Sequence, residues 1–397
     1  MMPRTAKLFF ILCLIFTAVH AGAQSYVPVY GAVVAQVSET NVLTNLEEFE
    51  SFGVKYRGTA AQENTLQWLK NKYLSFGYTA NQIVEDSFSY SGSTCKNLVV
   101  TKIGTLYPNT YVIVDGHYDT VNGPGTNDNG SGVSVILEIA RLLRNVPTQY
   151  SIKFINFSGE EDGLIGSQHY VDAVVNATTP KMDIRLVLNL DQVGGVAGEL
   201  NNTITCERDQ SNSPSSNNAA SNTMTMQLMN CVELYSSLNT NLSFAYASDY
   251  IPFENNGEVI TGLYEFNESP FPHTASDLLV NMDPEFVYKV AQATTGAVLH
   301  FAVACTTCNL GTSSVEVKED IKIYPNPAHD QFFIDMDNEG ECLKYSLSDV
   351  LGKKIKAETI IAAGSPISLD LAGIPSGVYL LTLETSDARI IRKVIID

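Results

Sequence analysis

The stretch YVIVDGHYD, residues 111–119, joins an apolar run rich in β-branched residues to a Gly-His-Tyr-Asp turn. Two further apolar runs have the same character, IKFINF at 152–157 and RLVLNL at 185–190. Short runs with little polar interruption are typical of strands that are buried on both faces. Because such strands belong to sheets covered on both sides, we expect a parallel or mixed central sheet.

Helical patterns alternate with these strands. Thr59 and Gln62 form a T-x-x-Q capping box before a run at helical spacing that stops at Gly77. Apolar residues recur at the same spacing over 133–143. The alternation predicts a three-layer α/β/α fold with a mixed, mostly parallel central sheet. Residues 201–222 are rich in Asn and Ser without apolar periodicity, so we expect a surface excursion there.

Residues 1–23 have the features of an export signal. Arg4 and Lys7 precede an apolar run at 8–19, and small residues follow as far as Ala23, after which we expect cleavage. A transmembrane helix needs about 20 apolar residues, whereas this run is roughly a dozen residues long. We therefore predict a signal peptide and no transmembrane anchor.

The end of the chain differs in character from the rest, and a chain of 397 residues is too long for one core. We expect an α/β domain over 24–307, a polar linker of small residues over 308–320 and a second domain over 321–397. In this second domain, short alternating runs are separated by turn signals. They predict a small β-sandwich whose strands include 331–335, 345–348 and 378–383.

Charge and cysteine content narrow the classes of partner. Lys and Arg number 24 against 43 Asp and Glu, a net charge of −19 that repels nucleic acid and anionic lipid. Export makes disulfides plausible, and Cys305 with Cys308 would close a small loop, although the remaining pairing stays open. A zinc ribbon needs a second CxxC, which the sequence lacks, so we expect no cysteine metal site.

Metal-binding types of side chain follow three of the predicted strands. Taken singly, each has an ordinary explanation, such as a hydrogen-bonded histidine, a solvated turn or a helix N-cap. Ligands in open α/β sheets gather beyond the carboxyl ends of strands, so their joint occurrence indicates one site. The residues are His117, Asp119, Glu160, Glu161 and Asp191, together with Asp128 in a glycine-rich loop before the second helix.

Two histidines have an aspartate placed to orient the ring, as a metal-bound histidine usually does. Asp119 follows His117 by two positions, and Asp277 follows His273 by four. Two cations close together need one bridging carboxylate and further His or carboxylate ligands on each. The histidines in helix-like sequence lack such neighbours and are expected to pack or to lie on the surface: His169 and His300.

The segments GHYD, NDNGSG, SGEEDGLIGS, NLD and PHTASD occur in this order over about residues 41–303. They resemble the two-zinc exopeptidases of metallopeptidase family twenty-eight, which include secreted bacterial leucyl aminopeptidases. The resemblance implies two Zn²⁺, with Co²⁺ or Mn²⁺ as substitutes, and makes Asp128 the carboxylate shared by both. It assigns the other ligands as Glu161 and His273 at one metal and His117 and Asp191 at the other.

The resemblance also implies roles in catalysis. Glu160 is the general base, which takes a proton from the attacking water and returns it to the leaving amine, and Asp119 is the second catalytic residue. A cis peptide is expected after Asp128. The free amine of the substrate lies near acidic side chains in these enzymes, which makes Asp249 and Glu265 candidates for substrate binding.

The tail has a likeness of its own. The segments YPNP at 324–327, SDVLGK at 348–353 and SGVY at 376–379, with a basic and apolar end, resemble the C-terminal sorting domain of type IX secretion cargo. This implies that the type IX machinery is a partner and that the chain passes through the periplasm to be secreted or attached to the outer-membrane surface. We expect the mature protein to end upstream of Ile321.

Together these patterns predict a secreted aminopeptidase that releases N-terminal, apolar residues from peptides. A glutaminyl cyclase-like enzyme with one zinc and a carboxypeptidase remain alternatives on the same fold. A non-catalytic surface binding protein should have lost ligands or the base, and none is missing here. The sequence leaves open the preferred side chain, the native metal, the disulfide connectivity, the oligomeric state and whether the protein is released or anchored.

Overall fold

The computed structural model describes residues 24–306, 322–335, 342–349, 354–361, 366–384 and 389–397. Contacts divide the chain into two units, Met1–Leu310 and Gly311–Asp397. The predicted signal peptide, 1–23, and the predicted linker, 308–320, lie outside the described residues.

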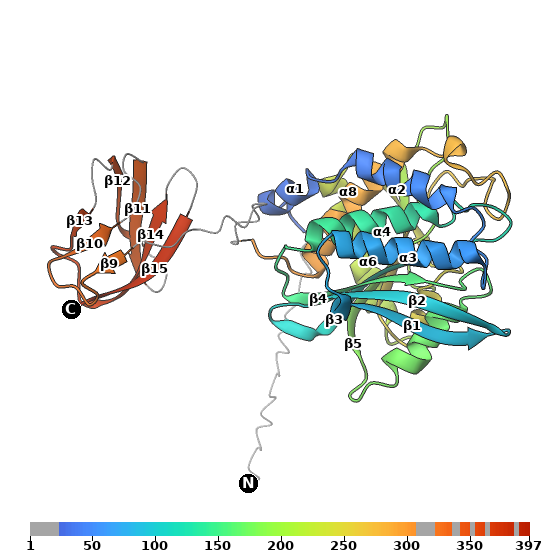
Figure 1. Cartoon of the computed structure of the whole chain (residues 1–397), viewed down its shortest axis with the longest axis horizontal. Helices are drawn as coiled ribbons and strands as arrows, with labels where there is room; N and C mark the ends of the chain where they lie inside the picture. The colour runs from blue at the N-terminus through green and yellow to red at the C-terminus, as the bar shows by residue number, and fades with distance from the viewer. Residues whose placement is uncertain (1–23, 307–321, 336–341, 350–353, 362–365, 385–388) are drawn as a thin grey trace, which may run out of the picture. The chain divides into compact units, whose positions relative to one another are not determined.

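The first unit is built on one mixed sheet (Figure 1). Its strands are β1 (Ile83–Tyr90), β2 (Ser93–Lys102), β3 (Tyr107–His117), β4 (Tyr150–Phe157), β5 (Asp183–Leu190), β6 (Thr203–Arg208), β7 (Asn239–Phe244) and β8 (Ile260–Glu265). They lie in the order β1-β2-β4-β3-β5-β8-β6-β7. The pairs β4–β3, β3–β5, β5–β8 and β6–β7 are parallel, and β1–β2, β2–β4 and β8–β6 are antiparallel. The predicted mixed, mostly parallel sheet is confirmed.

Helices cover both faces of this sheet. They are α1 (Pro28–Val34), α2 (Glu39–Ser51), α3 (Ala60–Ser75), α4 (Gly130–Leu143), α5 (Ile165–Tyr170), α6 (Asn218–Tyr235), α7 (Ile251–Asn255) and α8 (Pro284–Phe301). One core joins the sheet to α1–α4, α6 and α8, and a second core joins its other face to α5 and α7. On β5, Leu188 belongs to the first core and its neighbour Val187 to the second, as expected for a strand buried on both faces. The three-layer prediction is confirmed.

Two helix starts differ in detail from the expected caps. Thr59 caps α3, and its side chain accepts from the Gln62 N–H at 3.3 Å. In a complete capping box, the Gln62 side chain would accept from the Thr59 N–H. This part of the prediction is wrong, because Gln62 Oε1 accepts from the Gly58 N–H and its Nε2 donates to Ser158. The cap of α4 is Asn129, whose Oδ1 accepts from a backbone N–H, so the neighbouring aspartate is not used as a cap.

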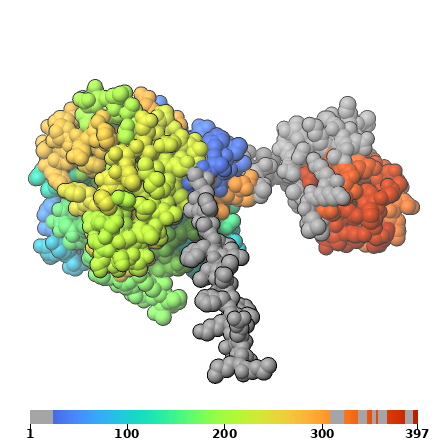
Figure 2. All heavy atoms as spheres, turned by 180° about the vertical axis from the view of Figure 1, so that it is seen from behind, coloured from blue at the N-terminus to red at the C-terminus, as the bar shows by residue number. Residues whose placement is uncertain are grey.

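The expected surface excursion at 201–222 is confirmed only for residues 210–216, an exposed connection, and is wrong for the residues on either side. Residues Thr203–Arg208 form β6, which pairs with both β7 and β8, and α6 begins at Asn218. The strand is only six residues long, and Thr205 and Glu207 alternate with apolar Ile204 and Cys206. So short an alternation lacks the apolar run that marks the other strands. In the view from behind, the segment that follows β5, yellow-green to yellow, makes up much of the face of the first unit (Figure 2).

The second unit consists of two antiparallel sheets. Their strands are β9 (Lys322–Tyr324), β10 (Gln331–Asp335), β11 (Cys342–Asp349), β12 (Lys354–Ile361), β13 (Ile367–Asp370), β14 (Gly377–Glu384) and β15 (Arg389–Ile396). The sheets have the orders β13-β10-β9 and β12-β11-β14-β15. Phe332 and Ile334 of one sheet share a core with Leu347 and Leu381 of the other. The predicted small β-sandwich is confirmed.

Cysteines and membrane spans complete the outline. Cys95, Cys206 and Cys231 are buried free thiols, and Cys305 is disulfide-bonded. Its expected partner, Cys308, lies outside the described residues. Within the described ranges, no helix combines the length and the apolar character that crossing a bilayer requires.

Candidate metal centre

The five predicted metal ligands come from different segments that end at one edge of the sheet. His117 is the last residue of β3, and Asp191 comes directly after β5. Asp128 precedes α4, Glu161 follows β4, and His273 lies between β8 and α8. Strands β3, β4 and β5 are parallel neighbours, so their carboxyl ends bring these side chains to the same place.

The ligand atoms converge around the Asp128 carboxylate. Nε2 of His117 lies 3.2 Å from Asp128 Oδ1 and 3.4 Å from Asp191 Oδ1. Nε2 of His273 lies 3.1 Å from Asp128 Oδ2 and 3.0 Å from Glu161 Oε2. The two oxygens of one carboxylate thus face two different histidines, which is the arrangement of a bridging ligand.

Glu160 lies beside the first of these groups. Its Oε2 is 3.9 Å from His117 Nε2, and ligand atoms of His117, Glu160 and Asp191 all lie within 4.8 Å of one another. Asp128, Glu161 and His273 form the second such group. Burial raises the pKa of Glu160 well above its usual range, while the charge of His117 opposes the rise. The predicted base is therefore within reach of the predicted metal site.

Three buried atoms test whether metal ions suit this cluster. His117 Nε2, Asp191 Oδ1 and Glu161 Oε1 have no hydrogen-bond partner among the described residues. Buried polar atoms normally have a partner, and the first two of these atoms lie 3.4 Å from each other within the cluster. Imidazole nitrogen and carboxylate oxygen are ligands that Zn²⁺ accepts. The residues present therefore fit divalent metal ions.

Asp277 supports the cluster in a different way from the predicted one. Its carboxylate accepts the N–H groups of Asn127 at 2.8 Å and of Asp128 at 3.0 Å. The expectation that it orients His273 is wrong, because these two hydrogen bonds hold the backbone that carries the shared carboxylate instead. Burial raises the pKa of Asp277 to about 6, and the two backbone N–H groups oppose the rise. The peptide bond that follows, Asp128–Asn129, is cis, as the resemblance implied.

Asp119 contacts His117 through its main-chain oxygen, and its carboxylate binds backbone N–H groups of the turn after β4. Nδ1 of His117 lies 3.1 Å from the main-chain oxygen of Asp119 and 3.8 Å from its carboxylate Oδ1. The carboxylate instead accepts the N–H groups of Glu160 at 3.2 Å and Glu161 at 3.3 Å. The predicted carboxylate contact to the ring is thus replaced by a carbonyl contact, and the carboxylate holds the turn that carries the base.

A hydroxyl that the sequence did not single out orients Asp191. Ser248 Oγ donates to Asp191 Oδ2 at 2.7 Å and accepts from Asn189 Nδ2 at 2.9 Å. This hydrogen bond leaves Oδ1 of Asp191 facing His117. Only the fold brings residues so distant in sequence together, so no local pattern could have identified Ser248.

The two candidate substrate-binding acids have other neighbours. Glu265 accepts hydrogen bonds from Asn127 Nδ2 and from the N–H groups of Gly195 and Ser269. Asp249 is fully buried. Neither is among the described residues that line the cavity beside the metal ligands.

This cavity has a volume of about 320 Å³. Its lining includes metal ligands and Glu160, the side chains of Leu164, Tyr246 and Tyr264, and Glu207, which belongs to neither group of candidate ligands. None of the described residues that line it is a lysine or an arginine. The lining comprises Asp128, Glu160, Glu161, Gly163, Leu164, Asp191, Gln192, Glu207, Tyr246, Ala247, Ser248, Tyr250, Tyr264 and His273.

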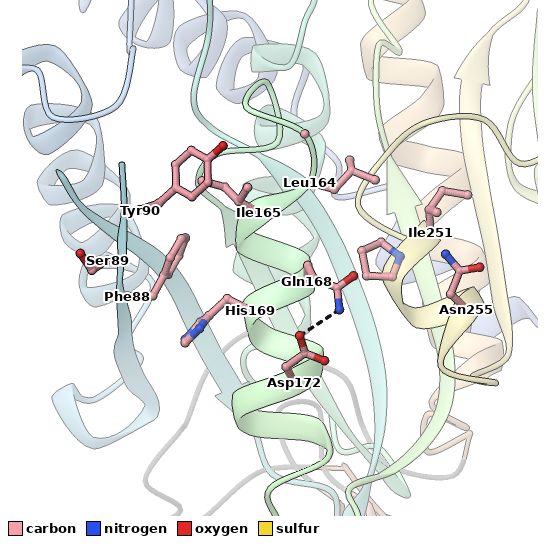
Figure 3. Close-up of a pocket in the computed structure, with 12 residues that line it drawn as sticks. Phe88, Ser89, Tyr90, Leu164, Ile165, Gln168, His169, Asp172, Ile251 and Asn255 are labelled. Atoms are coloured by element: carbon pink, nitrogen blue, oxygen red, sulfur yellow. Dashed lines mark hydrogen bonds between the residues drawn. The ribbon is translucent and has the colours of Figure 1, made fainter. Parts of the chain in front are cut away.

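A second cavity, of about 410 Å³, adjoins the first (Figure 3). Gly163 and Leu164 line both cavities. The side chains of β1 lie on one side of α5 in Figure 3, and those of α7 lie on the other. His169, expected to pack without a carboxylate, stacks on Phe88 but also has Nε2 3.2 Å from Asp86 Oδ1. Asp86 lies on β1 and is 83 positions away from His169 in the sequence, so sequence spacing could not show this contact.

Comparison with known proteins agrees with this fold and this ligand set. Residues 97–298 match the sequence profile of Peptidase family M28, and residues 322–397 match that of the Secretion system C-terminal sorting domain. The chain belongs to peptidase family M28.

Among curated proteins, the chain is 32% identical over 221 residues to "Aminopeptidase YwaD" of Bacillus subtilis. The alignment covers 53% of this chain and 45% of that protein, so the chain spans about half the length of this relative. A "Probable zinc metalloprotease" of Pyrenophora tritici-repentis is 28% identical over 197 residues, which cover 42% of this chain and 44% of the relative.

Solved structures show the same fold. LapA aminopeptidase of Legionella pneumophila superposes with a TM-score of 0.59 at 20% identity, over 76% of this chain and 80% of that chain. A glutaminyl cyclase of Fimbriiglobus ruber superposes with a TM-score of 0.53 at 15% identity, over 66% of this chain and 95% of that chain. At these identities the likeness shows the fold alone.

Proposed function

We propose that this chain is a secreted two-zinc aminopeptidase that hydrolyses N-terminal residues from peptides. The observation that carries the proposal is the Asp128 carboxylate, whose two oxygens face two histidines, each with a further carboxylate ligand. Asp128, Glu161 and His273 would hold one Zn²⁺, and His117, Asp191 and the shared Asp128 the other, with Co²⁺ or Mn²⁺ as substitutes.

Divalent ions bound there supply Lewis-acid polarisation of the scissile carbonyl and of the attacking water. Glu160 takes the proton from that water and delivers it to the leaving amine. Asp119 positions the base, because its carboxylate accepts the N–H groups of Glu160 and Glu161 and fixes their turn. Ser248 holds Asp191 in the orientation that keeps Oδ1 on the cluster.

The charge of the cavity supports an aminopeptidase over a carboxypeptidase. A carboxypeptidase must bind the terminal carboxylate of its substrate, for which arginine or lysine is the usual partner. The described lining contains neither, and five of its members are acidic: Asp128, Glu160, Glu161, Asp191 and Glu207. Bound zinc ions would offset the charge of the acids around them, so the lack of a lysine or arginine in the described lining is what favours an aminopeptidase.

Two other readings of the fold are less well supported. A glutaminyl cyclase-like enzyme would work with one zinc, whereas the cluster offers two complete groups of ligands. A non-catalytic binding protein would not need Glu160 beside the ligands. Leu164, Tyr246 and Tyr264 line the cavity and suit the apolar stem of a first side chain, and the preference for a wholly apolar residue stays a prediction.

The ends of the chain support export. We propose that residues 1–23 direct the chain to the periplasm and that the type IX machinery recognises the sorting domain, 322–397. The mature protein is then released or attached to the outer-membrane surface, with its end upstream of Ile321. Sequencing the C-terminus of secreted molecules tests this, and an intact Asp397 on most of them would contradict it.

One assay tests the enzymatic proposal. Amino-acid anilides are compared with their N-acetylated forms, with and without a chelator, and zinc is counted per chain. We expect cleavage of the free forms only, loss of cleavage with chelator and two zinc ions per chain. Cleavage that is indifferent to acetylation would contradict an aminopeptidase, and a single metal would favour the cyclase-like alternative.

A further inference from the structure

Glu207 is an acid in the cavity that the proposed hydrolysis does not use. It lies on β6 opposite Gly262 of β8, and Gly262 lies opposite Asn189 of β5. Asp191 therefore lies two strands across and two residues further along the sheet. With strands about 4.8 Å apart and a rise of about 3.3 Å per residue, the Cα atoms of Glu207 and Asp191 are ~12 Å apart. Among the described residues, Glu207 belongs to neither group of candidate metal ligands.

The surroundings of Glu207 contain no cation to balance it. Its side chain is buried, with 4% of the residue exposed, and it lines the cavity. Among the described residues, the hydroxyl of Tyr250 is the one donor to its carboxyl, at 2.6 Å from Oε2. An acid in such a place is costly to ionise unless a positive charge joins it.

The sheet leaves room for this arrangement at Gly262. A Cβ on Gly262 would lie 2.6 Å from Tyr250 Cε1 and 3.2 Å from Glu207 Oε2. Glycine therefore lets the tyrosine ring lie against the sheet next to the carboxyl. The result is a polar floor, formed by Glu207 and Tyr250, in a cavity whose walls include Leu164, Tyr246 and Tyr264.

We propose that Glu207 selects peptides whose first residue is lysine or arginine. The inference rests on the proposed aminopeptidase function and names its substrate class. With the scissile carbonyl at the ligand cluster, a long side chain lies along Leu164 and the tyrosines and brings its charged end to the Glu207 carboxylate. Lysine and arginine combine an apolar stem with a cationic end, which matches walls and floor.

The electrostatics of Glu207 agree with this role. Burial raises its pKa to about 8, the hydrogen bond from Tyr250 lowers it, and the charge of Asp191 raises it further. A cationic side chain beside the carboxyl favours the ionised form and gains a charge-assisted hydrogen bond. An apolar side chain gains neither.

The wild-type enzyme tests the proposal with a matched pair of substrates. Norleucine has the carbon chain of lysine without the ammonium group, so the anilides of lysine and norleucine isolate the charge. We expect kcat/KM for lysine anilide to exceed that for norleucine anilide by at least ~10-fold. Equal values, or a preference for norleucine, would overturn the proposal.

Glu207→Gln then identifies the residue, since glutamine keeps an acceptor for the Tyr250 hydroxyl. The ratio of kcat/KM for lysine over norleucine should fall by about 10- to 100-fold. Glu254→Gln is the matched control, because Glu254 is also a buried acid but does not line the cavity; it should leave the ratio unchanged. An unchanged ratio in a folded Glu207→Gln would overturn the role of Glu207.

The outcomes separate this inference from the function on which it rests. If the wild type cleaves neither anilide, the aminopeptidase proposal fails. If kcat/KM for norleucine and leucine anilides equals or exceeds kcat/KM for lysine anilide, the aminopeptidase proposal holds and the selection of cations fails. If Glu207→Gln does not fold, the wild-type comparison of lysine with norleucine still decides whether a cation is selected.

Discussion

Two parts of the active-site cavity contain buried acids with different neighbours: the metal-ligand cluster, called the metal end, and the floor formed by Glu207 and Tyr250. At the metal end, three carboxylates meet two histidines, and each histidine Nε2 lies 3.0 to 3.4 Å from an oxygen of each of two carboxylates. At the floor, a single acid, Glu207, meets one tyrosine hydroxyl and apolar walls. The described lining supplies no lysine or arginine to either end.

The difference indicates which cation each end requires. Several ligands that converge on one point can offset the free-energy cost of removing water from a divalent ion. A single carboxyl cannot. A single carboxyl in a cavity with apolar walls suits an organic cation whose charge sits at the end of an apolar stem. On the proposals above, the metal end would carry out the chemistry and the floor would select the substrate.

The largest effect is expected from Asp128→Asn. Asparagine has no negative charge and has one oxygen where aspartate has two. It therefore cannot bridge two metal ions as the carboxylate would, and the ligand sets of both metals are weakened. Metal content should fall well below two per chain, and turnover should fall below detection. Metal analysis and anilide hydrolysis measure both. Two tightly bound metals in an active variant would show that Asp128 is not the bridge.

Glu160→Gln should separate chemistry from metal binding at the same end. The amide cannot take a proton from the attacking water, so kcat should fall by about 10²- to 10⁴-fold while metal content stays unchanged. Asp172→Asn serves as the control and should keep full activity, because Asp172 is an exposed acid that is not in the lining beside the metal ligands. Activity of Glu160→Gln within tenfold of wild type would remove the base from this role.

The metal end could be predicted from the sequence because its ligands lie at the ends of recognisable strands. His117 and Asp191 each follow an apolar run directly, and Asp128 lies in a glycine-rich loop before a helix. The rule that ligands gather at the carboxyl ends of strands then brings them together. The three strands that lead into these residues, the layers and the C-terminal sandwich could be predicted for the same reason, since each follows from a local pattern.

The floor could not be predicted. Glu207 lies inside a strand of six residues within a segment rich in Asn and Ser, where no apolar run marks the strand. Its position opposite Gly262 follows from strand pairing alone. Asp277 shows the same limit, because its four-residue spacing suggested a contact with His273 whereas its partners lie about 150 positions away.

Asp277→Asn tests the backbone support of the metal end and should have an intermediate effect. The N–H groups of Asn127 and Asp128 donate to different oxygens of Asp277, so the amide keeps one hydrogen bond without its charge and loses the other, whose N–H then faces the amide NH2. Metal affinity should weaken by about 10- to 100-fold, as measured by titration with a competing chelator, while kcat at saturating zinc changes less. Unchanged affinity would show that these hydrogen bonds only shape the loop.

The smallest effect is expected from removing Gly311–Asp397, which asks whether both ends of the cavity belong wholly to the first unit. Every ligand, Glu160 and Glu207 come from Met1–Leu310, whose cores are separate from the core of the sandwich. A chain ending at Leu310 should therefore keep kcat/KM for lysine and norleucine anilides within about twofold of the full chain, because every described residue that lines the cavity belongs to the first unit and groups without shared partners usually couple by less than about 0.5 kcal/mol. A loss of tenfold or more for both substrates would mean that the metal end depends on the sandwich. A loss confined to lysine would mean that the floor depends on it.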